Sequence, residues 1–186
     1  MEPMTVVARG VSSIALLVLL GSGTPATALG QGAVYELDPE HTTVAFLVTH
    51  IGYARVLGQF GAVAGSFNFD EREGTIGNVE VTVETTSVTT AHPARDRHLR
   101  GEDFFDSGRH PQMRFVANDA RRTGERTFAI DGQLELLGMT RPLTLLATLN
   151  KSGEYPIGDR AHVVGVSVRG TLQRSDFGMT YGLDNG

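Results

Sequence analysis

The stretch VEVTVE, residues 79–84, alternates valine with a polar residue at every position. Because successive side chains of a β-strand point to opposite faces, this period of two predicts a strand. Its three valines then share one face, which we expect to be buried, while the glutamates and the threonine face water. Such one-sided burial is typical of antiparallel sheets, in which one face covers the core and the other meets solvent.

The same period of two recurs along most of the chain. Residues 44–50 read VAFLVTH, and we expect the face that carries Phe46, Val48 and His50 to look inward. Phe67 and Phe69 repeat the spacing further along. Eight strands separated by turns are predicted in this way, at residues 34–37, 44–50, 65–69, 79–83, 113–117, 128–136, 143–149 and 160–172.

Eight short strands joined by short loops predict an all-β fold, either an up-and-down barrel or a sandwich. Closing a sheet of this size removes its exposed edges, and the interior is then either filled by side chains or holds one small ligand. Gly65 and Ala117 among the large inward residues leave room for a ligand, or they accommodate a neighbouring Phe. The residues alone leave both alternatives open.

One segment, residues 92–101, breaks the alternation and predicts a short helix. Pro93 lies near its start and Gly101 follows its end, as is typical of helix boundaries. Leu99 is the one large apolar residue that can dock the helix. Asp96 and Arg100 are four residues apart, so we expect an ion pair on the helix surface.

The N-terminus predicts a signal peptide over residues 1–28. Arg9 precedes an apolar run at 11–20, and Ala26-Thr27-Ala28 forms a cleavage site. We expect the cut after Ala28, with Gly30 as the alternative, and a retained N-terminal anchor is the competing interpretation. The mature chain then contains no integral membrane segment, since no later run reaches the roughly 18 to 20 apolar residues of a spanning helix.

Composition narrows the function classes. With 186 residues, 40% of them hydrophobic, the chain suits one domain. A formal charge of −5 argues against wholesale binding to nucleic acid or to anionic membrane, and leaves only local basic patches to consider. The chain contains no Cys, and it lacks nucleophile-elbow, zinc-protease and phosphate-loop motifs. We therefore expect neither an enzyme nor a metal site.

A set of short motifs runs through the chain in a fixed order. These are residues 35–42 (YELDPEHT), 50–52 (HIG), 58–60 (GQF), 95–99 (RDRHL), 103–106 (DFFD), 110–111 (HP), 137–142 (LGMTRP) and 174–178 (RSDFG). In this content and order the chain resembles the YceI-like family of exported, lipocalin-like proteins, over residues 33–182.

The resemblance implies an extended eight-stranded antiparallel barrel with one short helix near its mouth. It also implies a periplasmic protein that carries or sequesters a polyisoprenoid or another long-chain lipid, such as a prenyl pyrophosphate or a quinone-like molecule, with no other cofactor. It favours a ligand cavity over a filled interior. The head group, the chain length and the oligomeric state, including a homodimer, stay open.

The ligand-contacting residues that we expect are Phe46, Val48, His50, Phe67, Phe69, Val81, Arg95, His98, Phe104, Phe105, Met113 and Phe115. His50 ends an inward row and would meet a polar head group, or is a buried histidine held by a backbone carbonyl. Arg95 and His98 would receive a pyrophosphate, or lie on a solvated helix face, or, for Arg95, tie the helix to the barrel. Phe104 and Phe105 would close the tunnel or fill the core.

Two other function classes stay open beside the lipid carrier. One is an enzyme that acts on a lipid head group through His50 or His98. The other is a structural or stress-protective envelope protein whose interior is dry and filled.

Overall fold

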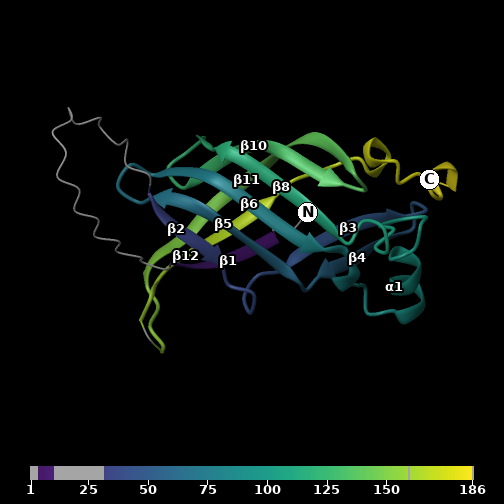
Figure 1. Ribbon diagram of the computed structural model, residues 1–186, viewed down its shortest axis with the longest axis horizontal. Helices are drawn as coiled ribbons and strands as arrows, with labels where there is room; N and C mark the ends of the chain where they lie inside the picture. Colours follow the sequence, from purple (N-terminus) through teal and green to yellow (C-terminus); the bar gives the residue numbers. More distant parts are fainter. Residues whose placement is uncertain (1–3, 11–31, 159, 186) are drawn as a thin grey trace, which may run out of the picture.

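Strands dominate the computed structural model, which describes residues 4–10, 32–158 and 160–185 (Figure 1). Nine strands form one antiparallel sheet. Their spatial order is β11 (Met139–Glu154), β12 (His162–Arg169), β1 (Met4–Gly10), β2 (Ala33–Leu37), β5 (Val63–Asp70), β6 (Thr75–Glu84), β8 (Gln112–Asp119), β10 (Thr127–Leu136) and β9 (Arg121–Arg122). Because β10 also pairs with β11, the sheet closes on itself as a barrel.

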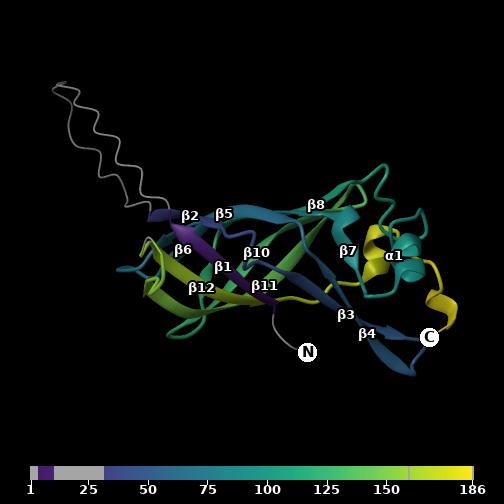
Figure 2. The same ribbon diagram turned by 90° about the horizontal axis from the view of Figure 1, so that it is seen from below.

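A second, smaller sheet extends one end of the barrel. It contains β3 (Val44–His50), β4 (Ala54–Phe60) and β7 (Val88–Thr89). The helix α1 (Pro93–Leu99) lies at the same end, together with the 3₁₀ turns η1 (Thr85–Ser87), η2 (Arg174–Phe177) and η3 (Leu183–Asn185) (Figure 2). We call this end of the molecule the α1 end.

The predicted fold class is confirmed: the protein is all-β, with an antiparallel barrel and one short α-helix. All eight predicted strands are present, but their membership of the barrel differs. β3 leaves the barrel because it pairs along its whole length with β4, a strand that the alternation did not reveal. Its place in the ring of eight is taken by β1.

β1 lies within the segment that was predicted to be a signal peptide, where no strand was expected. Its backbone pairs with β12 over residues 4–9 and with β2 over residues 8–10. The two predicted cleavage positions, Ala28 and Gly30, lie outside the described residues. Export therefore stays a prediction, and cleavage at either position would remove a strand from this barrel.

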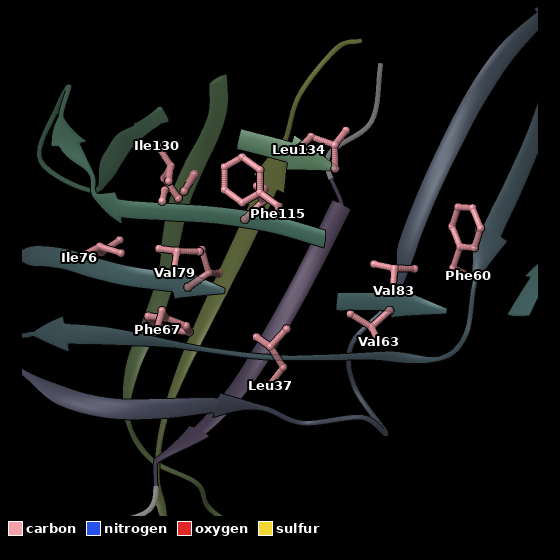
Figure 3. Close-up of a cluster of buried hydrophobic side chains, with 14 of the residues drawn as sticks. Leu37, Phe60, Val63, Phe67, Ile76, Val79, Val83, Phe115, Ile130 and Leu134 are labelled. Carbon is pink, nitrogen blue, oxygen red and sulfur yellow. The ribbon is translucent and has the colours of Figure 1, made fainter. Parts of the chain in front are cut away.

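The inward rows of the barrel strands form the core (Figure 3). Val79, Val81 and Val83 on β6 lie opposite Ala117, Phe115 and Met113 on β8, so that the residues that the alternation places on one face of each strand meet. Burying a side chain of this size contributes about 1.5–3 kcal/mol, so these rows are a main source of stability.

Two inward glycines fit close neighbours rather than open space. A Cβ on Gly65 would lie 2.2 Å from the carbonyl oxygen of Glu80, and one on Gly132 would lie 2.4 Å from Cζ of Phe115. At Gly65 the backbone of β6, and not a neighbouring Phe, occupies the space that the missing side chain leaves. At Gly132, which the sequence did not single out, the ring of Phe115 occupies it.

Candidate functional site

The wall of the barrel interior is apolar along its length. Each buried residue that belongs to a described strand is hydrophobic or a glycine. The buried polar and charged residues in the described part of the chain all lie in α1, η1 and the loops: Asp38, Thr42, Thr85, Asp96, Asp106 and Ser107. An interior of this kind can accommodate an apolar chain but offers little to a charged group.

Five of the residues predicted to contact a ligand belong to this wall. Phe67, Phe69 and Phe115 are buried, while Val81 and Met113 are partly buried and pack against them. Their inward direction is as predicted from the alternation. Their contact with a ligand stays a prediction.

The α1 end holds a cluster of three aromatic rings. Phe46 on β3 lies 5.5 Å from Phe60 on β4 and 6.3 Å from Phe105, measured between ring centroids. Phe60, which was not among the predicted contacts, is only 2% exposed. The motif at 58–60 contains Phe60 and could have pointed to it. Gly58 of the same motif leaves space for the Phe46 ring, which contacts Phe60.

The inward direction predicted for Val48 and His50 is wrong. Val48 is 44% exposed, and His50 is exposed as well. The reason is that β3 continues past the rim of the barrel, so that no opposite wall covers the outer half of the strand. His50 is therefore not the buried, carbonyl-bound histidine that was one of the two alternatives.

Helix α1 is tied through Asp96 and Arg95 to Thr90, in the segment that joins the helix to β7. Thr90 donates hydrogen bonds to Asp96 Oδ1 from its backbone nitrogen and its hydroxyl, at 2.8 and 2.5 Å. Arg95 donates to the hydroxyl and the carbonyl of Thr90, at 2.8 and 3.0 Å. The hydrogen bond from the Thr90 side chain is the main reason why the pKa of Asp96 lies below its usual range. Of the alternatives for Arg95, the structure favours a structural tie, which is made to Thr90 beside β7 of the second sheet and not to a strand of the barrel.

The surface ion pair predicted between Asp96 and Arg100 is not formed. Asp96 is buried under the threonines of the preceding loop. Arg100 instead donates to the backbone carbonyls of Thr86 and Val88, both at 2.8 Å. Tertiary partners outcompete the i, i+4 pair because they satisfy a buried carboxylate and two carbonyl groups at once.

His98 and Phe104 lie together on the outer side of α1. The His98 ring is edge-on to Phe104 and to Tyr181, with centroids 5.0 and 4.9 Å away, and its Nε2 lies 2.9 Å from a carboxylate oxygen of Asp103. Phe104 is partly buried, whereas Phe105 is buried. The two phenylalanines thus have different surroundings: Phe105 is part of the core, whereas Phe104 packs against the core from an aromatic patch with His98 and Tyr181.

Two depressions on the surface lie outside the predicted site. One, of about 470 Å³, is lined by β8, β10 and β11, and another, of about 210 Å³, lies between β11 and residues 171–177. None of the twelve residues predicted to contact a ligand lines either of them. The inward side chains pack against one another as a single cluster.

A group of polar side chains lies at the other end of the barrel. Tyr35 stacks on Phe67 at 5.7 Å between ring centroids, and burial together with the negative charge of Glu71 raises the pKa of the Tyr35 hydroxyl. His162 lies beside it, 2.9 Å from Ser152 Oγ and 3.4 Å from a carboxylate oxygen of Glu71. Alternation predicted Tyr35 only as part of a strand.

The motif at 35–42 covers the end of β2 and the turn that follows it. His41 Nδ1 lies 2.9 Å from one carboxylate oxygen of Asp38, and the backbone nitrogen of Glu40 donates to the other at 2.9 Å. Ligand atoms of these three residues lie within 4.8 Å of one another. Their arrangement fits a side-chain cap of the turn.

Comparison with known proteins places this chain in a family. A YceI-like domain model matches residues 35–186. The chain belongs to the YceI-like family. It is 35% identical over 167 residues to a UPF0312 protein of Pseudomonas savastanoi pv. phaseolicola, covering 88% of this chain and 86% of the relative. It is also 35% identical over 172 residues to a UPF0312 protein of Pectobacterium carotovorum, covering 92% and 85%.

Solved structures share the YceI-like fold. The crystal structure of the Campylobacter jejuni YCEI protein superimposes with a TM-score of 0.64 at 27% identity, covering 80% of this chain and 89% of that one. BcnA of Burkholderia cenocepacia has a TM-score of 0.56 at 16% identity, which shows a common fold alone. Within the described part of this YceI-like chain, no helix is both long and apolar enough to cross a membrane.

Proposed function

We propose that this YceI-like protein binds the apolar chain of a long-chain lipid, a polyisoprenoid or a quinone-like molecule, inside its barrel, and carries or sequesters it in the cell envelope after export. The observation that carries the proposal is the apolar barrel wall, with buried polar groups confined to the connections. Such a wall selects ligands by their hydrocarbon content.

Burial of the lipid chain is the main favourable contribution to binding in this proposal. Each buried methylene contributes about 0.8 kcal/mol, so ten of them supply about 8 kcal/mol before the costs of association. Because the inward rows pack against one another, a ligand chain enters only if side chains such as Phe67 and Phe115 move apart. Binding then exchanges contacts between side chains for contacts with the lipid.

In this proposal the polar head group of the lipid lies at the α1 end. Most of the buried polar residues lie in the segments around α1, and the hydroxyl of Ser107, itself buried, has no hydrogen-bond partner among the described residues. His98 lies at the same end. A head group there can meet donors and acceptors while its chain extends along the apolar wall.

Native mass spectrometry of protein purified from its own host, followed by solvent extraction, tests the proposal. We expect a co-purifying lipid whose mass fits a long isoprenoid or acyl chain. Reproducible absence of lipid, together with no uptake of added prenyl lipids, would contradict it and favour a structural protein. Fractionation of the same host tests the envelope location, and recovery in the cytoplasm would contradict that part.

The enzyme alternative has its own measurement. Turnover of an added prenyl pyrophosphate that is lost in His50→Ala or in His98→Ala would replace the carrier proposal with catalysis on a head group. Binding without turnover supports the carrier.

A further inference from the structure

The hairpin of β3 and β4 exposes apolar side chains. Tyr53 at its turn is 91% exposed, and Leu57 on β4 is 58% exposed. Ile51, Val48 and Leu47 are exposed as well. In both views the hairpin projects beyond the barrel at the α1 end (Figures 1 and 2). A protruding apolar tip of this kind marks an interaction surface.

The apolar residues lie on both faces of the hairpin. Leu47 is directly opposite Leu57, and the neighbouring pair Val48 and Val56 points to the other face, because the side chains of adjacent residues alternate. A rigid protein partner would cover one face of such a tip and leave the other in water. A fluid lipid interface surrounds both.

The turn at the tip is under backbone strain. Ile51 has a φ of 49° and Gly52 a φ of 73°, and the backbone nitrogen of Tyr53 donates to the carbonyl of His50 at 3.0 Å. Positive φ at both central positions is what a type I′ turn requires, and Asn-Gly adopts it easily whereas a β-branched residue adopts it poorly. An apolar residue stands at the strained position although 45% of it stays exposed.

The charge of the hairpin differs from that of the rest of the chain. No Asp or Glu occurs between Glu40 and Asp70, in a chain with a formal net charge of −5. Arg55, beside the tip, forms no ion pair or side-chain hydrogen bond with another described residue. A free guanidinium next to exposed Tyr and Ile side chains is complementary to the phosphate and acyl layers of a phospholipid surface.

An apolar route leads from the tip to the core. Val48 continues to Phe46, whose ring contacts Phe60 and Phe105, and both of these are buried in the core cluster. The C-terminal segment adds exposed Tyr181 and Leu183 at the same end.

We propose that the tip of the β3–β4 hairpin, residues 47–57, docks into the headgroup and upper acyl region of a phospholipid bilayer. Tyr53 lies at the interface, Ile51 enters the acyl layer, and Arg55 meets phosphate. This docking goes beyond the proposed lipid binding and does not depend on it, and it would align the apolar route with the membrane from which a lipid is taken.

A single tryptophan tests the docking directly, because the chain contains no Trp. Tyr53→Trp is made in the protein purified from its producing cells with its native N-terminus. The matched control is Ile157→Trp, at a site that is 70% exposed in the turn between β11 and β12, at the other end of the barrel (Figure 1). Vesicles of phosphatidylethanolamine with a minor fraction of phosphatidylglycerol are added, and Trp emission and co-flotation are recorded.

We expect a blue shift for Tyr53→Trp and none for Ile157→Trp. Ile51→Asn in the Tyr53→Trp background should weaken vesicle binding by about tenfold or more, because one large apolar side chain is lost. The substitution creates the favoured Asn-Gly turn, so the midpoint temperature of thermal unfolding should not fall. This measurement separates lost docking from misfolding.

Three results would overturn the proposal. The first is no blue shift of Tyr53→Trp with vesicles, and the second is equal shifts for the two tryptophans. The third is a blue-shifted, concentration-dependent emission without vesicles, which identifies a second copy of the chain as the partner. If vesicle docking is absent while native mass spectra still show a bound lipid, the proposed lipid binding stands and the docking proposal fails. If vesicle docking is seen but no lipid is bound, the docking proposal stands and the proposed lipid binding fails.

Discussion

The ring of Phe105, in the loop after α1, meets the ring of Phe60 edge to face with centroids 5.2 Å apart. Phe60 ends β4, so this contact joins the hairpin sheet to the α1 end of the barrel. Figure 3 places Val63 and Val83 between Phe60 and the barrel core. The contact joins two segments that are 45 residues apart in the sequence, and it reinforces the Phe46–Phe105 contact and the pairing of β4 with β7.

Phe105→Ala should lower the free energy of unfolding by about 3–5 kcal/mol, since a large buried ring is replaced by a cavity. Urea unfolding followed by circular dichroism measures the change. Tyr53→Ala, at the exposed tip, is the control and should change stability by no more than about 0.5 kcal/mol. Equal effects of the two substitutions would contradict the contact.

Gly132→Ala should destabilise the barrel by about 1–3 kcal/mol through overpacking. The added Cβ would lie 2.4 Å from both Phe115 Cζ and the Val116 carbonyl oxygen. Gly61→Ala is the matched control, because a Cβ there meets nothing within 4 Å. If the two variants unfold at the same urea concentration, the interior around Phe115 is roomier than described.

Phe67→Arg should abolish co-purification of lipid, because it places a charge in the apolar wall. Val34→Arg, on the neighbouring strand β2 at a half-exposed outward position, should leave lipid binding unchanged. Native mass spectra of both variants decide the matter. Retention of lipid in Phe67→Arg would show that the ligand lies elsewhere.

Asp96→Asn should lose stability at neutral pH and lose less of it in acid. The pKa of Asp96 is lowered in the folded state, so its carboxylate stabilises the fold above the unfolded pKa and that contribution disappears as the pH falls through the folded value. Denaturation midpoints of the wild type and the variant should therefore converge below about pH 4. Asp119→Asn, exposed at the end of β8, serves as the control. A constant gap at all pH values would argue against this role of the charge.

Sequencing of the exported protein should find Leu29 as its N-terminus. Cleavage after Ala28 removes β1, and β2 and β12 then lose the strand with which both of them pair. We expect faster hydrogen exchange along β2 and β12 in this form than along β5 and β6, whose neighbours remain. An N-terminus upstream of Met4 would show instead that β1 belongs to the working barrel.

Local pattern was enough to predict eight of the strands and which side chains share a face in each of them. The period of two in residues 79–84 fixes which side chains share a face, because this follows from the backbone of a single strand. The inward direction of Phe67, Val81 and Phe115 was predictable for that reason. The helix was predictable as well, since Pro93 and His92 mark its start in the sequence and in the structure.

Tertiary structure decided what lies opposite each face. The alternation that directs Phe67 inward is the same one that was taken to bury Val48, yet Val48 is exposed because β3 continues past the barrel rim. Arg100 does not pair with Asp96, four residues away, but donates to the carbonyl groups of Val88 and Thr86, which lie 12 and 14 residues earlier in the chain. Burial and pairing depend on segments distant in the chain, so one sequence determines the faces of its strands, while the packing of those strands decides which faces become core, wall or exposed tip.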